Sequence, residues 1–65
     1  MVNQSDVLRA AALLITQHGE DAWLEAISKS TDLKASGDKA ASQMWGRIAE
    51  AIADMHDQEN VGKPN

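Results

Sequence analysis

The chain contains no cysteine, phenylalanine or tyrosine and only one proline among its 65 residues. Without cysteine, neither a disulfide framework nor a thiolate metal site can form, and the composition suits a reducing cytoplasm. The longest apolar run, Ala10 to Ile15, is far shorter than the roughly 20 residues that cross a bilayer. We therefore expect a cytoplasmic protein that does not enter a membrane and that is stabilised by packing alone.

The sequence also lacks the groups of residues that catalysis and metal binding need. His18 and His56 belong to separate predicted helices and have no further ligand at a suitable spacing, so no metal site is expected. The serines stand in no nucleophile motif, and the segment 37–39 is too short for a phosphate-binding loop. Because three short helices enclose little space, we predict that the protein is not an enzyme and binds no cofactor.

Apolar residues recur at three- and four-residue steps in the first half of the chain, which is typical of amphipathic helices. The first helix is predicted over residues 6–18, with Ser5 as its N-cap and Gly19 just beyond its end. A second helix is predicted to open at residue 20 and to end at Gly37. It is expected to break or bend near Ser30, where short polar side chains compete for backbone hydrogen bonds.

The second half of the chain has the strongest helical periodicity. Asp38 is predicted to cap a third helix, which we expect to end between His56 and Glu59, because continuing it would turn Glu59 toward the apolar side. The short connections between successive helices predict an all-α fold, a compact three-helix bundle. Residues 1–60 are predicted to form a single helical domain, and residues 61–65 a flexible tail.

A small core is predicted from the side chains that share these helical periods. Trp23 and Trp45, the only aromatic residues, are expected to anchor it, and Gly46 is expected to mark a tight helix crossing. A chain of this length either closes its own core or completes it across a two-fold interface, and we favour a monomer over a homodimer. The predicted core consists of Leu8, Leu14, Ile15, Trp23, Ile27, Leu33, Met44, Trp45, Ile48, Ile52 and Met55.

Negative charge is concentrated in one part of the chain. Residues 1–47 contain six acidic and five basic side chains, whereas residues 48–60 contain four acids and no Lys or Arg. The formal net charge of −4 therefore lies almost entirely in the C-terminal stretch. This charge argues against direct binding to nucleic acid or to anionic lipid, and it favours a basic protein surface as the partner.

Two groups of acidic residues form the candidate partner-binding site. Glu50, Asp54 and Asp57 follow the i, i+4, i+7 spacing that places them on one solvent-facing ridge of a helix. Acids near a helix C-terminus oppose the dipole, and like charges at i, i+4 repel, so the ridge costs stability, and this cost favours a binding use. A face that only keeps the protein soluble is the alternative. The second group lies at a helix start, where the dipole alone explains it, and consists of Glu20, Asp21 and Glu25.

Three short patterns stand out along the chain. They are Leu14-Ile15-x-x-His18-Gly19-x-x-Ala22, Gly37-Asp38, and Trp45-x-Arg47-Ile48-x-x-Ala51-Ile52. Over about residues 8–55 the chain therefore resembles a family of very short proteobacterial helical proteins of unknown function. It departs from that family at Ala41, where the family has glycine, and this changes how closely the third helix approaches a neighbour. The resemblance implies a helical fold and carries no activity.

The small size, the acidity and the lack of cysteine also resemble those of small phage-encoded anti-CRISPR proteins. Such inhibitors commonly occupy basic channels that receive DNA. The resemblance implies an acidic, DNA-mimicking inhibitor in the cytoplasm of a bacterial host, with a subunit of a type I Cascade complex as its partner and DNA access as the blocked step. The alternative is a bacterial structural or regulatory interaction module, which binds through an apolar groove and whose charges only solubilise it.

Overall fold

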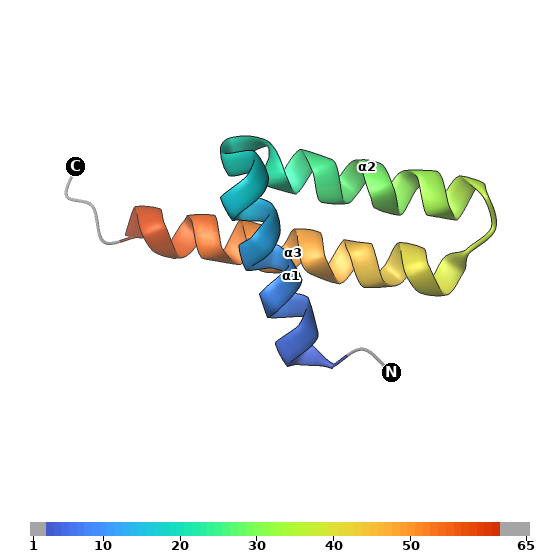
Figure 1. The fold of residues 1–65 in the computed structure, drawn as a ribbon, viewed down its shortest axis with the longest axis horizontal. Coiled ribbons are helices and arrows are strands. Elements are labelled where there is room, and N and C mark those ends of the chain that lie inside the picture. Colours follow the sequence, from blue (N-terminus) through green and yellow to red (C-terminus); the bar gives the residue numbers. More distant parts are fainter. Residues whose placement is uncertain (1–2, 62–65) are drawn as a thin grey trace.

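A computed structural model describes the backbone of residues 3–61 and the side chains of residues 3–56 (Figure 1). The elements are the α-helix α1 (Gln4–His18), the 3-10 helix η1 (Gly19–Asp21) and the α-helices α2 (Ala22–Ala35) and α3 (Lys39–Val61). No strand occurs among these residues, so the predicted all-α class is confirmed. Residue 61 still belongs to α3, and the rest of the predicted tail, residues 62–65, lies outside the described residues.

The start of α1 is fixed by Asn3 and not by Ser5, the residue predicted to cap it. The Asn3 side chain accepts a hydrogen bond from the Asp6 backbone N–H at 3.0 Å, and the Asn3 N–H donates to the Asp6 carboxylate at 3.5 Å. This reciprocal pair is a capping box, which satisfies a backbone donor on each side of the first turn. The helix therefore begins two residues earlier than predicted.

The chain passes from α1 to α2 without a coil residue between them. Gly19 has a positive φ of 58°, and its N–H donates to the Ile15 carbonyl, so it ends α1 as predicted. The 3-10 turn then carries the chain directly into α2, and residues 4–35 form one long helical segment that bends at η1. The fold thus has two continuous helical segments, this bent one and α3. The prediction of three separate helices is wrong, because η1 takes the place of a loop.

A tight turn at Gly37 reverses the chain between α2 and α3. Gly37 has a φ of 92°, and its N–H donates to the Lys34 carbonyl at 3.1 Å. The Asp38 N–H donates to the Leu33 carbonyl at 2.9 Å, so the last carbonyls of α2 are satisfied. Asp38 then caps α3 as predicted, since its carboxylate accepts the Ala41 N–H at 3.1 Å.

The third helix is longer than predicted. α3 continues to Val61, past the predicted end between His56 and Glu59. No glycine or proline interrupts the chain between Gly46 and Gly62, and the intervening glutamine and glutamate are good helix formers. With 23 residues against 14 in α2, α3 follows the 44 Å long axis of the molecule (Figure 1).

The helices are arranged in two different ways around α3. α2 lies beside α3 and antiparallel to it, whereas α1 crosses the C-terminal half of α3 (Figure 1). The N-terminal part of α1 extends past α3 on the side away from α2. The N-terminal half of α3 is therefore covered by α2 and not by α1.

The core lies where the helices meet and is built mainly from small side chains. Ile52 is its largest fully buried residue. The other buried hydrophobic residues are Val7, Ala11, Ala22, Ala26, Ile48, Ala49 and Ala51. Alanines at the contacts let the helix backbones approach closely, and larger side chains are displaced to the edge. The predicted core positions of Leu8 and Trp23 are wrong, since these side chains are 42% and 45% exposed. The remaining predicted core residues are buried or partly buried.

Two serines join α2 to α3. Ser30 Oγ donates to the Ser42 carbonyl and Ser42 Oγ donates to the Ser30 carbonyl, both at 2.8 Å. The break predicted near Ser30 is wrong, because its hydroxyl bonds to α3 and does not disturb the backbone of α2. The crossing at Gly46 does not require glycine, since a Cβ there would meet only the Ser30 hydroxyl, at an ordinary contact distance of 3.9 Å.

Candidate partner-binding surfaces

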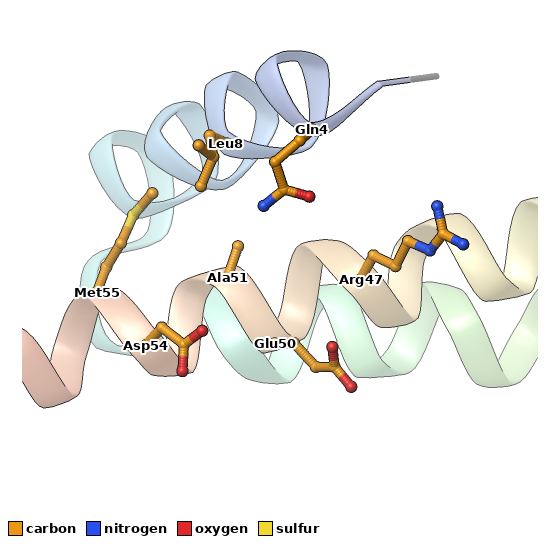
Figure 2. A pocket seen from close by; sticks show the side chains of 7 residues that line it. All are labelled: Gln4, Leu8, Arg47, Glu50, Ala51, Asp54 and Met55. Atoms are coloured by element: carbon orange, nitrogen blue, oxygen red, sulfur yellow. The ribbon is translucent and has the colours of Figure 1, made fainter. Parts of the chain in front are cut away.

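A hollow between α1 and α3, here called the α1–α3 hollow, contains two of the predicted acidic residues (Figure 2). Its volume is about 530 Å³. It is lined by Gln4, Leu8, Arg47, Glu50, Ala51, Asp54 and Met55. Leu8, Ala51 and Met55 lie between the two helices, while the carboxylates of Glu50 and Asp54 point away from α1 (Figure 2). The hollow therefore has an apolar floor and a charged edge.

Arg47 lies next to the predicted acidic ridge, at its N-terminal end. It lies one turn before Glu50 on α3, and its guanidinium extends along the hollow, away from both carboxylates (Figure 2). Glu50 and Asp54 are exposed, while the side chain of Asp57 lies outside the described residues. The face is consequently of mixed charge where the structure describes it.

A second hollow, here called the Trp23 hollow, lies where η1 and the start of α2 meet α3. It is lined by Glu20, Trp23, Ala53 and His56, and its volume is about 440 Å³. Trp23 is nearly half exposed, and the next residue, Leu24, is 60% exposed. His56 Nε2 is buried and has no hydrogen-bond partner among the described residues, so its bonding capacity is unused.

The second predicted acidic group is divided around this hollow. Glu20 lines it, whereas Asp21 and Glu25 are exposed without lining it. Glu25 follows Trp23 by two residues, which places it about 200° away around the axis of α2. Among the predicted acidic residues whose side chains are described, Glu50 and Asp54 line the α1–α3 hollow, and Glu20 lines the Trp23 hollow.

A third hollow lies on the N-terminal half of α3, which α1 leaves uncovered. It is lined by Ala40, Ala41, Gln43, Met44 and Arg47, and its volume is about 320 Å³. Arg47 also lines the α1–α3 hollow, so the two hollows adjoin along α3. Helical periodicity places these alanines and Met44 on or beside the apolar side, but it does not show which part of that side a neighbouring helix covers.

The described residues include no group of three or more His, Asp or Glu side chains that could hold a metal ion. No helix in this part of the chain combines the length and the apolar composition that a membrane span requires. No protein-family model matches the chain, and neither a curated protein nor a solved structure shows significant similarity to it. The chain is thus a small all-helical protein whose family is not identified by these comparisons.

Proposed function

We propose that the protein is a small interaction module and that the Trp23 hollow binds a protein partner. The half-exposed Trp23 supports this most directly. Tryptophan is enriched among the residues that dominate binding energy, and a large apolar side chain gains stability when a partner covers it. In a chain whose core consists mostly of alanine, a tryptophan side chain that no partner covers would be expected inside.

The surroundings of Trp23 favour a basic partner with an apolar anchor. Glu20 borders the same hollow, and Asp21 is exposed beside it in the sequence. A Lys or Arg side chain at the edge of the interface would meet these carboxylates, while an apolar side chain would pack on the indole ring. The exposed Leu24 extends the apolar part of this surface.

Affinity capture with three immobilised proteins tests this proposal. The parent is compared with Trp23→Gln and with the control Leu13→Gln, which alters an exposed leucine of α1 that lines none of the hollows described above. We expect one partner to be retained by the parent and by the control but lost with Trp23→Gln, and its binding to weaken as salt is raised. Equal capture by all three proteins would contradict the assignment of the surface.

We also propose a narrower function, favoured by the exposure of five of the predicted acids: Glu20, Asp21, Glu25, Glu50 and Asp54. In this proposal the partner is a CRISPR effector of the Cascade type, and the carboxylates take the place of DNA phosphates in its basic channel. This proposal includes the two resemblances of the sequence described above, to the short helical family and to the anti-CRISPR proteins.

A DNA-competition assay with a purified Cascade-type complex tests the narrower function. The parent should reduce DNA binding, and the triple variant Glu50→Gln, Asp54→Asn, Asp57→Asn should reduce it much less while keeping its helical content. Full inhibition by the folded triple variant would remove these carboxylates from the mechanism. Absence of any competition by the parent would leave the general interaction module.

A further inference from the structure

The exposed face of α3 carries charges of opposite sign in its two halves. Lys39 and Arg47 lie in the N-terminal half, and Glu50 and Asp54 follow in the C-terminal half; all four side chains are exposed. Between Lys39 and Asp54 the helix rises by about 22 Å. A second helix of the same sequence would therefore meet opposite charges if it ran antiparallel and like charges if it ran parallel.

The apolar surface beside this face is also divided into two parts that can complement each other. At one end, Leu8 and Met55 form the floor of the α1–α3 hollow. At the other end, Ala40 and Met44 lie in the hollow that α1 leaves uncovered. An antiparallel second copy would bring the Met44 end of each α3 to the Leu8 end of the other, because residues on the same flank of two antiparallel helices face each other across the two-fold axis.

Ala40 is exposed at the end of the uncovered hollow and leaves room there for the second copy, whereas Ala51 is already buried beneath α1 and takes no part in the contact (Figure 2). The N-terminal part of α1 extends past α3 on the side away from α2, so it would border the second copy without lying between the two α3 helices (Figure 1).

We propose that α3 of a second copy of this chain packs antiparallel against α3, so that the protein forms a symmetric homodimer with reciprocal Arg47–Asp54 ion pairs. The two-fold axis passes close to Glu50, so the two Glu50 carboxylates approach each other, and the two Arg47 guanidiniums must offset their repulsion. Arg47 of one copy lies between Glu50 and Asp54 of the other, where its forked guanidinium can bind both carboxylates. The dimer thereby compensates the i, i+4 repulsion between Glu50 and Asp54 within each α3.

This interface differs from the Trp23 hollow, so the interaction module proposed there and the dimer can fail separately. Glu50 and Asp54 serve both the dimer and the narrower DNA-mimicking function, so dimerisation and that function exclude each other on one copy. The dimer also differs from the monomer that the sequence analysis favours. The sequence does not show the hollows on which the dimer depends, because they follow from where α1 covers α3 and where it does not. The formal net charge of −4 on each copy opposes association, and the local charge pairs must outweigh it.

Sedimentation equilibrium of the full chain tests the proposal. The parent should reach twice its monomer mass of 7.0 kDa as the concentration is raised toward about 1 mM, and high salt should weaken the association. The single variants Arg47→Glu and Asp54→Arg should each weaken the dimer by about 100-fold, because each places two like-charged pairs across the interface. Circular dichroism checks that both variants stay helical.

Mixing the two single variants gives the decisive result. Each should be largely monomeric alone, but an equimolar mixture should form a heterodimer, because the introduced glutamate then faces the introduced arginine while Arg47 faces Asp54. Trp23→Gln, which changes the other surface, should dimerise like the parent. A parent that remains at 7.0 kDa at about 1 mM overturns the proposal. So does a dimer that both single variants form as tightly as the parent.

Discussion

The contact of α3 with α2 and its contact with α1 are built in different ways. α2 runs along α3, and Ser30 and Ser42 exchange hydrogen bonds between the two helices. α1 crosses α3, and Gln4 and Leu8 border an open hollow there. The first contact fixes the position of one helix along the other through directed bonds. The second depends on small apolar side chains and leaves surface for a partner.

This difference separates a contact held by directed hydrogen bonds from one that borders an open hollow, within a very small protein. Chains of this size bury a modest fraction of their surface and have little stability in reserve. The α2–α3 pair supplies a defined frame, while Leu8 at the contact between α1 and α3 stays 42% exposed.

The largest effect is expected at Ile52, the largest fully buried side chain of a core cluster to which α1, α2 and α3 all contribute. Ile52 is fully buried in the core cluster, so Ile52→Ala should lower the free energy of unfolding by about 3–4 kcal/mol. A loss of that size unfolds a substantial part of a marginally stable domain. Thermal denaturation followed by circular dichroism measures it. A melting temperature within a few degrees of the parent's would show that the core is not centred on this residue.

A smaller loss is expected when the serine pair is altered. Ser42→Ala should lower the free energy of unfolding by about 1 kcal/mol, because it leaves a part-buried polar group without its partner. The double variant with Ser30→Ala should lose less than the sum of the two single changes, since both partners are then absent. Ser28→Ala is the matched control for the helix propensity of Ser30→Ala, because Ser28 is an exposed serine of α2, the helix that contains Ser30. Strict additivity in urea denaturation would argue against coupling between the two serines.

Removing the capping box should affect the other contact. Asn3→Ala should cost about 1 kcal/mol and should act mainly on α1, whose first turn loses its cap. Hydrogen exchange is the measurement: amides at the start of α1 should exchange faster, while those of α2 and the N-terminal half of α3 should change little. Equal acceleration in all three helices would show that the two contacts unfold as one unit.

The smallest effect is a gain in stability. Gly46→Ala should raise the free energy of unfolding by about 0.5–1 kcal/mol, because alanine favours the helix and the added Cβ has room beside Ser30. Chemical denaturation compares the variant with the parent. A loss of stability would mean that α2 and α3 approach more closely at this position than the 3.9 Å contact indicates.

The sequence predicted several helix boundaries of this fold better than it predicted how the helices pack. The ends at Gly19 and Gly37 and the cap at Asp38 follow from residues within one turn of each boundary. Helical periodicity marks an apolar side for each helix, but it does not state the angle at which two helices cross. Because α1 crosses α3 and does not run along it, Leu8 on the predicted apolar side lies on the floor of an open hollow and is 42% exposed.

For the candidate surfaces too, the sequence predicted which residues of one helix are exposed but not which residues of different helices meet. The exposure of Glu50 and Asp54 follows from their positions opposite the apolar side of α3. The position of Gln4 in the α1–α3 hollow could not be predicted in this way, because the hollow is formed by residues more than forty positions apart in the sequence. The 45% exposure of Trp23 could not be predicted from its size, because it depends on which side chains the close packing of the helices leaves outside the core.

Because α1 continues directly into η1 and α2, the direction of the α1 axis depends on the torsion angles of very few residues. α1 is 15 residues long, so it spans about 22 Å, and a tilt of about 10° at its C-terminal end displaces the Gln4 end by about 4 Å. Such a tilt would widen or narrow the hollow beneath Leu8 without any change in α2 or its serine bonds. Substitutions in the three residues of η1 are thus a means to redesign the width of a binding groove independently of the frame that carries it.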